Sequence, residues 1–550
     1  MRIGLGQFNS VVGDLPGNVR KIQEFYTRAL KEKMDLLVCP ELCICGYPPE
    51  DLVLKKHFLE QCTSSIEQTA AACPDMTIIA GFVETDGEES YNSAAVMYGG
   101  KVTKIYRKGQ LPNHGVFDER RYFQPGNKPL IIDVGGITIA VTICADIWHL
   151  KWLADFLKNS MPFDMLVNIS ASPFGYGKID VREHVIRDCS LKLNCAVAYC
   201  NLIGGQDEIV FDGRSILTES TGKTITKAKA FDEDLLIADI VRTENGKVQI
   251  KPLIPAVPQP KNTIDEIYQA LVLGTRDYTL KNGFQKVLLG LSGGIDSSLV
   301  AAIAVTALGR ENVIGITMPT QFNSPETISD AGKLAKNLGI EFLTIPIQSV
   351  LQAFDNSLKT VHGWESKGIA YENLQARIRG TILMSLSNKT GSLVLTTGNK
   401  SETAVGYSTL YGDTAGGFAV IKDVPKTMVY ELARHINTIA GWDIIPSDVL
   451  TRIPSAELKY NQKDSDSLPD YDLLDEILKG YVEDDKSAGQ LIQSGLPKDI
   501  VLRVIRMVDK NEYKRRQSPP GVKITSKAFG KDRRLPITNY YKSGSDMTGS

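Results

Sequence analysis

The run KVLLGLSGGIDSSLV at residues 286–300 constrains the fold of this chain more than any other stretch. Residues 286–291 form a short apolar segment that predicts a strand, and residues 297–308 are rich in helix-forming side chains. In a strand–turn–helix unit of this kind, exposed backbone N–H groups and the N-terminus of the helix meet at one point, where they bind anions. The run therefore predicts a phosphate site in an α/β sheet.

The residues on either side of this run alternate between helix and strand patterns. Regular alternation of this kind predicts a doubly wound parallel sheet, in which ligands bind beyond the carboxyl ends of the strands. The expected helices are 263–281, 295–308, 325–338 and 370–388, and the expected strands are 286–291, 312–318, 341–347 and 392–398.

The first 250 residues alternate between strand and helix patterns as well. Residues 137–144 and 195–201 are apolar on both alternating faces, so we expect strands that are covered on both sides. Residues 93–107 are expected to form a hairpin. The other expected strands are 2–8, 35–40, 77–83, 164–170 and 235–240, and the expected helices are 17–33, 51–72, 149–159 and 178–193.

A chain of 550 residues is too long for a single hydrophobic core, and a proline-rich stretch marks where it divides. Four prolines in PLIPAVPQPKN, without strand or helix periodicity, are typical of a linker between domains. We therefore expect one domain at 1–250, a linker at 251–262, a second domain at 263–540 and a disordered tail at 541–550.

The composition is that of an ordinary globular protein, with 43% hydrophobic and 23% charged residues. A formal net charge of −2 argues against a nucleic-acid partner or a membrane-surface partner. No apolar run approaches the ~20 residues of a membrane span, and the N-terminus has no secretion-signal pattern, so we expect a cytoplasmic protein. The nine cysteines are odd in number and lack a paired zinc spacing, which favours reduced thiols.

The SGGIDSS turn suits a bound pyrophosphate. It lacks the lysine of a GxxxxGK[ST] loop. Gly293 and Gly294 let the backbone approach an anion, and Asp296 repels phosphate unless Mg²⁺ lies between them. Serine hydroxyls are available from Ser292, Ser297 and Ser298. The turn resembles the PP-loop of ATP pyrophosphatases, which implies cleavage of ATP to AMP and pyrophosphate with formation of an acyl adenylate.

Four longer strings resemble NAD⁺ synthetases, namely those at 372–380, 395–427, 454–475 and 514–537. This resemblance implies that deamido-NAD⁺ is adenylated and that Asp296 and Glu402 bind Mg²⁺. It also implies contacts to ATP and pyrophosphate from Ser292, Gly293, Gly294, Asp296, Ser297, Ser298, Thr397 and Lys426, and contacts to deamido-NAD⁺ from Arg377, Asn399 and Asp413.

Amidation of the adenylate consumes ammonia, which at neutral pH is mostly ammonium and has no lone pair for attack. The first domain is therefore a candidate amidohydrolase, and three of its expected strands end at Glu41, Lys108 and Cys144. In this hypothesis Cys144 attacks an amide carbonyl, Glu41 moves the protons, and Lys108 stabilises the oxyanion and lowers the pKa of the thiol.

The strings PELCICGYPPEDL, YRKGQLPNHGVFDERRYF and TICADIW resemble the nitrilase superfamily, and within it the glutaminase branch that is fused to NAD⁺ synthetases. The resemblance implies an αββα sandwich with Glu41, Lys108 and Cys144 as catalytic residues. It also implies glutamine contacts from Glu119, Ser170, Ser172 and Tyr176. One departure is Ala145, where relatives commonly carry an acidic residue, and Asp146 is expected to point to the other face of the strand.

The predicted chain is an α/β protein with an N-terminal nitrilase-like αββα sandwich and a C-terminal doubly wound parallel sheet of the PP-loop ATP pyrophosphatase type. The predicted ligase reaction converts deamido-NAD⁺, ATP, glutamine and water to NAD⁺, AMP, pyrophosphate and glutamate. A homo-oligomer is expected, because relatives of both halves assemble through subunit interfaces. The alternatives are a PP-loop amidotransferase with a different acceptor and a non-catalytic nucleotide-sensing scaffold.

Overall fold

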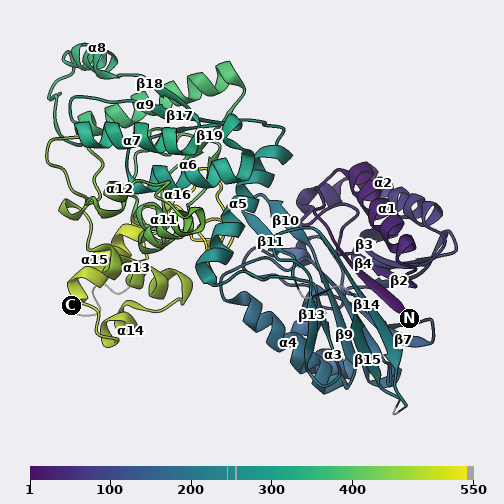
Figure 1. Ribbon diagram of the computed structural model, residues 1–550. Helices are drawn as coiled ribbons and strands as arrows, with labels where there is room; N and C mark the ends of the chain where they lie inside the picture. The colour runs from purple at the N-terminus through teal and green to yellow at the C-terminus, as the bar shows by residue number, and fades with distance from the viewer. Residues whose placement is uncertain (245, 254, 256, 542–550) are drawn as a thin grey trace. The chain divides into compact units, whose positions relative to one another are not determined.

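The computed structural model describes residues 1–244, 246–253, 255 and 257–541, and the chain divides into two compact units, Met1–Lys261 and Asn262–Ser550 (Figure 1). Strand β15 (Val248–Pro252) reaches into the expected linker, and helix α5 (Thr263–Lys281) begins directly after the end of that linker. Except for Tyr541, the expected tail lies outside the described residues. Within the described part of the chain, no helix combines the length and the apolarity that crossing a membrane requires.

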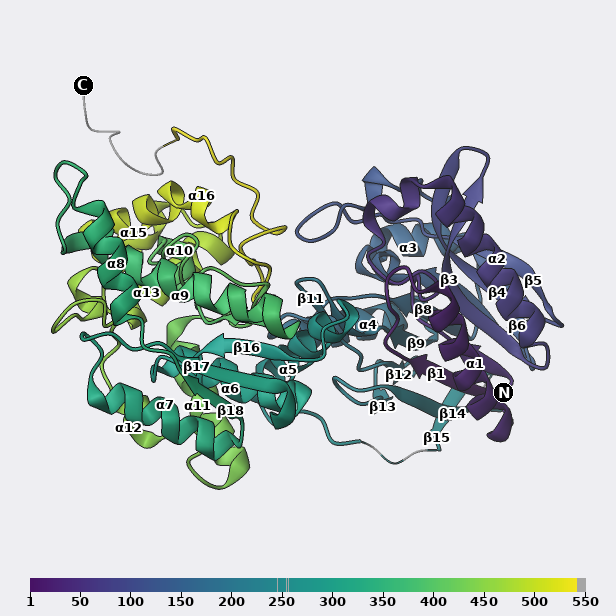
Figure 2. The same ribbon diagram turned by 90° about the horizontal axis from the view of Figure 1, so that it is seen from above.

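The first unit contains a seven-stranded and a six-stranded sheet (Figure 2). The strand order is β15-β14-β1-β2-β3-β4-β5 in the larger sheet and β13-β12-β9-β8-β7-β6 in the smaller one. The larger sheet has β1 (Arg2–Gln7), β2 (Leu36–Val38), β3 (Thr77–Asp86), β4 (Glu89–Tyr98), β5 (Lys101–Arg107) and β14 (Asp234–Arg242) beside β15. The smaller has β6 (Leu130–Val134), β7 (Ile137–Ile143), β8 (Met165–Ser170), β9 (Ala196–Asn201), β12 (Ile216–Thr218) and β13 (Thr224–Lys227).

Three apolar layers hold this unit together. The first lies between the two sheets and contains Val38 and Ile143. In the second, helices α1 (Leu15–Lys31) and α2 (Lys56–Ala72) cover the other face of the larger sheet and contact Leu37. In the third, α3 (Leu150–Leu157) and α4 (Lys178–Leu193) cover the smaller sheet. Leu37 and Val38 lie in different layers because neighbours along a strand point to opposite faces. The predicted αββα sandwich is confirmed.

The second unit is built on a parallel sheet with the order β18-β17-β16-β19-β20. Helices α8 (Gln348–Leu358) and α9 (Gly368–Thr390) share an apolar cluster with one face of this sheet, while α5, α6 (Ile295–Leu308), α7 (Pro325–Leu338) and α11 (Lys426–Ala440) lie on the opposite face (Figure 2). The predicted doubly wound parallel sheet is confirmed. Its strands are β16 (Val287–Gly290), β17 (Val313–Thr317), β18 (Glu341–Thr344), β19 (Leu393–Thr396) and β20 (Phe418–Ala419).

The second unit also contains a helical cluster, and the sequence patterns do not predict its individual elements. Side chains of these helices, among them Val405, Leu474 and Val504, form one buried cluster. Full burial of an aliphatic side chain of this size stabilises a fold by about 1.5–3 kcal/mol. The helices are α10 (Lys400–Val405), α13 (Tyr471–Leu478), α14 (Ala488–Gln493) and α15 (Lys498–Lys510); the short α12 (Ser447–Thr451) lies between α10 and α13, and α16 (Glu512–Arg515) follows α15.

The expected elements are mostly present. Strand β6 and helices α8 and α11 have no counterpart among them, and three further differences follow. The expected helix 51–72 is interrupted at Lys55, whose backbone is extended, so a 3₁₀ turn at Glu50–Leu54 precedes α2. The expected strand 341–347 ends at Thr344. The strands between residues 203 and 227 have only three or four residues each, which is too short for a pattern to predict; they include β10 (Ile203–Gln206) and β11 (Ile209–Asp212).

Candidate active sites

The three expected catalytic residues of the first unit lie at the ends of three strands. Glu41 follows β2 in the chain, and Lys108 and Cys144 come directly after β5 and β7. Lys108 Nζ donates a hydrogen bond of 2.6 Å to Glu41 Oε1. All three residues are buried, and the charges of Glu41 and Lys108 both act on the Cys144 thiol. The structure therefore brings the expected carboxylate, ammonium and thiol together.

Glu119 joins this group through the same ammonium. Lys108 Nζ donates to both of its oxygens, at 2.8 and 2.9 Å. Tyr47 OH donates to Glu119 Oε1 at 2.8 Å, and Asn92 Nδ2 donates to Glu41 Oε1 at 2.8 Å. Each carboxylate thus has a second partner that fixes its orientation. The sequence analysis assigns no role to Tyr47 or Asn92, since each is informative only once the fold places it beside the carboxylates.

Electrostatics in this group correct one expectation. Burial, helped by the nearby Glu41, raises the pKa of the Cys144 thiol to about 12, although Lys108 acts to lower it. The expected lowering of the thiol pKa by Lys108 is therefore outweighed by the missing solvent and the nearby carboxylates. For Lys108, burial acts to lower the pKa, but Glu119 and Glu41 raise it above its ordinary value. Cys144 is a neutral thiol in the free protein, so its attack needs a base, and Glu41 is placed to be one.

Asp146 has a structural task that the sequence analysis does not assign. Its Oδ1 accepts hydrogen bonds from the backbone N–H groups of Gly109 at 3.1 Å and Gln110 at 2.8 Å. Its Oδ2 accepts from Ile143 N at 2.9 Å and from Tyr106 OH at 2.8 Å. Burial raises the pKa of this carboxyl to about 6. One carboxylate thus ties the turn that carries the thiol to the segment that follows Lys108.

The expected glutamine contacts lie at the end of β8, where Ser170 is the last residue, and on the loop that follows it. Ser170 Oγ donates to Asn168 Oδ1 at 2.7 Å, and the Ser172 backbone N–H donates to Asn201 Oδ1 at 2.9 Å. Between them, Ala171 N donates to Glu41 Oε2 at 2.7 Å. Ser170 and Ser172 are buried, whereas Tyr176, farther along the loop, is half-buried. The loop adjoins the catalytic group, and the individual glutamine contacts stay predictions.

Two buried groups near this loop were not predicted. Arg182 forms a bidentate ion pair with Asp212 and donates to Ser172 O at 3.4 Å. Tyr199 is fully buried, and its hydroxyl has no hydrogen-bond partner among the described residues. No sequence pattern identifies Arg182, because a helical arginine is usually exposed; only the pairing with Asp212 explains its burial.

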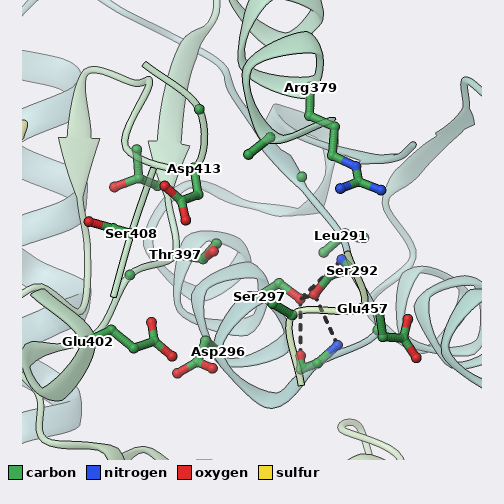
Figure 3. Close-up of a pocket in the computed structure, with 18 of the residues that line it drawn as sticks. Leu291, Ser292, Asp296, Ser297, Arg379, Thr397, Glu402, Ser408, Asp413 and Glu457 are labelled. Atoms are coloured by element: carbon green, nitrogen blue, oxygen red, sulfur yellow. Dashed lines mark hydrogen bonds between the residues drawn. The ribbon is translucent and has the colours of Figure 1, made fainter. Parts of the chain in front are cut away.

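In the second unit, the SGGIDSS turn lines a cavity of about 330 Å³ at the carboxyl end of β16 (Figure 3). Gly293 has φ +80°, and a Cβ there would lie 2.1 Å from Thr327 O. Ser292 and Ser297 share a hydrogen bond of 3.1 Å between their hydroxyls, and both line the cavity. Ser298 does not line it; its hydroxyl donates to Gly294 O at 2.8 Å and stabilises the turn.

The two expected metal ligands face one lysine at the floor of this cavity. Lys426 Nζ donates to Asp296 Oδ2 and lies 3.5 Å from Glu402 Oε1. Burial, together with the neighbouring Asp296, raises the pKa of Glu402 to about 8, although Lys426 acts to lower it. Burial acts to lower the pKa of Lys426, but Asp296 and Glu402 keep it above its ordinary value.

These two carboxylates fit Mg²⁺. No cluster of three or more metal-ligating side chains occurs among residues 1–244, 246–253, 255 and 257–541. Mg²⁺ is, however, usually held by one or two carboxylates together with substrate phosphates, and Asp296 and Glu402 lie beside a turn that suits phosphate. Asp296 accepts from Asn399 Nδ2 and pairs with Lys426, and Glu402 faces the same Lys426 ammonium, so a cation bound between the two carboxylates would relieve the repulsion between their ionised forms.

The three residues expected to contact deamido-NAD⁺ differ in whether they line the cavity. Asp413 lines the cavity, and burial raises the pKa of its carboxyl to about 6. Asn399 lies behind the metal pair, where its side chain donates to Asp296 Oδ1 at 2.9 Å and accepts from Glu402 N at 3.0 Å. Arg377 is exposed and does not line the cavity; its Nε donates to Leu410 O. Its role stays a prediction.

Three further side chains line the cavity without having been assigned a role. Arg379, from the same helix as Arg377, donates to Met318 O at 3.0 Å, and burial lowers its pKa to about 10. Arg452 donates to the PP-loop carbonyl Gly293 O at 3.1 Å. Glu457 accepts from Thr327 Oγ1 at 2.8 Å. Helical periodicity does not decide which arginine of α9 faces the cavity, and Arg452 lies just before the string at 454–475.

Comparison with known proteins agrees with both sites. The family model described as NAD synthase matches residues 267–518, and the one described as carbon-nitrogen hydrolase matches residues 2–248. The chain is 44% identical to a glutamine-dependent NAD(+) synthetase of Thermotoga maritima and 45% identical to one of Aquifex aeolicus, over 98% of this chain and at least 99% of those proteins. A solved glutamine-dependent NAD⁺ synthetase of Acinetobacter baumannii, in complex with ADP, has 41% identity and a TM-score of 0.78 over 98% of this chain and 99% of that one.

Proposed function

This chain belongs to the family of glutamine-dependent NAD(+) synthetases, and we propose that its first unit releases ammonia from glutamine while its second unit uses that ammonia to make NAD⁺. The overall reaction is that of an ATP-dependent carbon–nitrogen ligase: deamido-NAD⁺, ATP, glutamine and water give NAD⁺, AMP, pyrophosphate and glutamate. The observation that carries the assignment of residues is the 2.6 Å contact between Lys108 and Glu41 beside the Cys144 thiol.

In the first unit, Glu41 takes the proton of the Cys144 thiol as the sulfur attacks the glutamine amide. The pKa of about 12 means that this proton leaves during the attack rather than before it. The Lys108 ammonium stabilises the oxyanion of the tetrahedral intermediate, and Glu41 passes its proton to the departing ammonia. Glu41 then activates water against the thioester, which releases glutamate and restores the thiol.

Glu119 keeps the ammonium of Lys108 charged and in place, because both of its oxygens accept from Lys108 Nζ. Ser170, Ser172 and Tyr176 are proposed to hold the rest of the glutamine molecule. Ala145 supplies no carboxylate for the amino group of the substrate, so a contact to that group must come from another residue.

In the second unit, the turn at Ser292–Ser298 is proposed to hold the β- and γ-phosphates while the carboxylate of deamido-NAD⁺ attacks the α-phosphate. Ser292 and Ser297 supply hydroxyl donors, and Gly293 lets the backbone approach the anion. Thr397, Asp413 and Lys426 line the same cavity and are proposed to contact the nucleotides. Mg²⁺, when bound to Asp296 and Glu402, neutralises charge on the departing pyrophosphate.

Two further statements about the protein are proposals. A homo-oligomer is proposed on the family resemblance alone. A cytoplasmic location is supported by the nine cysteines, all of which are buried and free.

The test incubates the protein with deamido-NAD⁺, ATP and either glutamine or ammonium. We expect NAD⁺, AMP and pyrophosphate in equal amounts with both nitrogen sources. Formation of ADP in place of AMP would contradict adenylation. An absence of NAD⁺ with either nitrogen source, alongside AMP formation from another carboxylate, would instead favour a PP-loop amidotransferase with a different acceptor.

A further inference from the structure

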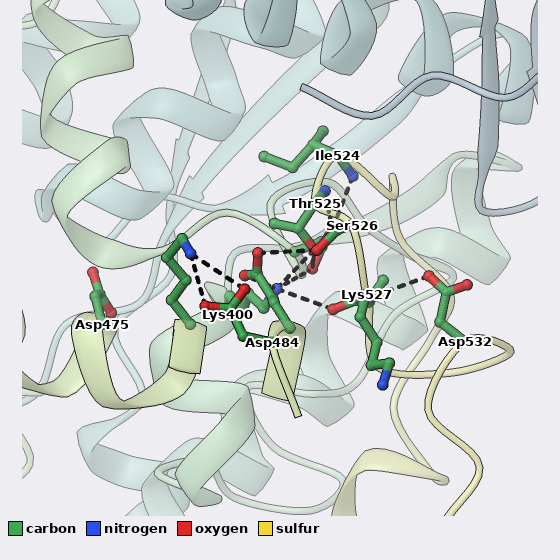
Figure 4. Close-up of polar contacts among 12 residues, drawn as sticks. Lys400, Asp475, Asp484, Ile524, Thr525, Ser526, Lys527 and Asp532 are labelled. Atoms are coloured by element: carbon green, nitrogen blue, oxygen red, sulfur yellow. Dashed lines mark hydrogen bonds and ion pairs between the residues drawn. The ribbon is translucent and has the colours of Figure 1, made fainter. Parts of the chain in front are cut away.

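A buried lysine lies directly behind the nucleotide cavity and contacts none of the groups assigned above to ATP or Mg²⁺. Lys400, the first residue of α10, is 1% exposed. Its ammonium lies 2.7 Å from Glu483 Oε1 and 2.9 Å from Asp423 Oδ1, and it donates to Thr525 Oγ1 at 2.8 Å and to Lys527 O at 3.2 Å (Figure 4). Every proton of this ammonium therefore has a partner.

Two of these partners belong to a segment close to the C-terminal end of the chain. Asp423, which precedes α11, accepts hydrogen bonds from Ile524 N at 2.9 Å, Thr525 N at 2.8 Å and Thr525 Oγ1. Ala419 N, in β20, donates to Pro520 O at 2.8 Å. Residues 520–527, called here the C-terminal segment, are thus fastened both to the edge of the sheet and to Lys400.

The residues next to Lys400 hold the nucleotide site. Asn399 donates to Asp296 Oδ1 at 2.9 Å, and Ser401 Oγ accepts from Lys426 N at 2.9 Å. Glu402 faces Lys426 Nζ at 3.5 Å. Four consecutive residues therefore share one helix start: three of them contact the metal carboxylate or the phosphate lysine, and Lys400 joins them to the C-terminal segment.

A buried ionic group is poor evidence for stability, because well-packed apolar residues usually serve as well or better. What charged hydrogen bonds add is a fixed direction. The Lys400 ammonium has four oxygen partners at 2.7 to 3.2 Å, so its direction is fixed on every side. The location of the group at the start of α10 makes that geometry matter for the cavity.

We propose that the C-terminal segment is a positioning element of the adenylation site, which acts through Thr525 and Asp423 on Lys400 and so fixes Asn399 and Glu402. Lys400, Asp423 and Thr525 are positioning residues, since they reach the substrate only through α10. This inference rests on the proposed function of the second unit. It adds that ATP is bound and cleaved efficiently only while the C-terminal segment is fastened to Lys400.

The test compares two substitutions of Thr525, which is fully buried. Thr525→Val keeps the shape of the side chain and removes the hydroxyl that joins Asp423 to Lys400, whereas Thr525→Ser keeps the hydroxyl. A matched control is Lys527→Met, which breaks only the outward ion pair with Asp485 in the same segment. Each protein is assayed for NAD⁺ synthesis with ammonium and, separately, for glutamine hydrolysis.

We expect Thr525→Val to lower kcat for synthesis at least tenfold and to raise the KM for ATP at least fivefold, with weaker ATP binding in calorimetry. Thr525→Ser and Lys527→Met stay within about twofold of the wild type, and glutamine hydrolysis is unchanged in all three variants. A Thr525→Val protein that merely folds less well would lose kcat without a change in the KM for ATP, and that result overturns the proposal.

Two other results also overturn it: wild-type kinetics in Thr525→Val, or an equal loss in Thr525→Ser. Failure of the underlying function looks different, because then the wild-type protein itself forms no NAD⁺ from ammonium.

Discussion

The substitution Asp146→Asn tests whether one carboxylate sets the geometry around the thiol. Asp146 accepts four hydrogen bonds in the structure, three of them from the backbone N–H groups of Gly109, Gln110 and Ile143, and the fourth from Tyr106 OH. An asparagine replaces one accepting oxygen with an NH₂ group. In either orientation of the amide, at least one buried backbone N–H then faces another donor.

Two free-energy terms of opposite sign follow from this change. A buried backbone donor without a partner costs about 1–3 kcal/mol. Burial raises the pKa of Asp146 from its ordinary 3.8 to about 6. Keeping this carboxylate ionised therefore costs the folded protein ~3 kcal/mol at pH 7, and neutral asparagine avoids that cost. The terms nearly cancel, so we expect the free energy of unfolding to change by less than ~2 kcal/mol.

No such cancellation is expected for the rate of glutamine hydrolysis. A shift of ~1 Å in a reacting group can cost about 100-fold in rate, so we expect glutamine hydrolysis to fall about 10- to 100-fold. The pH dependence of the free energy of unfolding gives a second way to test the role of Asp146. Folded Asp146 keeps a proton that the unfolded chain loses above pH ~4, so wild-type stability falls by ~3 kcal/mol between pH ~4 and pH ~6 through this group, and the variant lacks that fall.

The assays are glutamate release from glutamine, urea unfolding at several pH values, and NAD⁺ synthesis from ammonium as an internal control. The last activity belongs to the second unit and should stay unchanged. Hydrolysis within twofold of the wild type would refute a positioning role for Asp146. An equal loss of the ammonium-dependent activity would show a general defect in the protein.

Gly293→Ala should lower the rate of pyrophosphate release more than ~100-fold, because the added Cβ would lie 2.1 Å from Thr327 O and because φ of residue 293 is +80°. A rate above one-tenth of the wild type contradicts this. With a pKa of about 8, most Glu402 side chains carry a proton at pH 7, so the binding of Mg²⁺·ATP should release up to one proton. Calorimetry in two buffers of different ionisation enthalpy measures this release, and no release contradicts the prediction. Arg182→Met removes the bidentate partner of buried Asp212 and leaves it the more distant Arg214 Nε at 3.9 Å, so the unfolding free energy of the first unit should fall by up to about 3–5 kcal/mol in urea; a loss below 1 kcal/mol contradicts this.

The sequence predicts those features that depend on neighbours in the chain. Strands that end at Lys108 and Cys144, and a glycine-rich turn between strand and helix at Gly293, are visible as local patterns. The parallel sheet of the second unit follows from the alternation of strands and helices, whereas the αββα sandwich of the first unit was implied by the resemblance to the nitrilase superfamily. These local patterns were enough to predict the fold class and the two reactive regions.

Other features depend on neighbours in space. Asp146 was expected on the far face of an extended strand, but the chain turns at Cys144, where φ is +38°, and the carboxylate then reaches Gly109 and Gln110. The raised pKa of the thiol comes from burial, which no motif reports. Arg379 lines the cavity, whereas the resemblance pointed to Arg377 as a contact to deamido-NAD⁺. The two arginines lie two residues apart on one helix, and the sequence alone does not decide which of them faces the cavity.

The most direct test of the division between the two units is the variant Cys144→Ala, assayed for NAD⁺ formation with each nitrogen source. Removal of the sulfur leaves Glu41 and Lys108 without a nucleophile to serve, while the cavity around Asp296 is unaltered. We predict that synthesis from glutamine falls to background and that synthesis from ammonium stays within about twofold of the wild type. Synthesis from glutamine that survives the substitution would contradict the account, and so would the loss of both activities together.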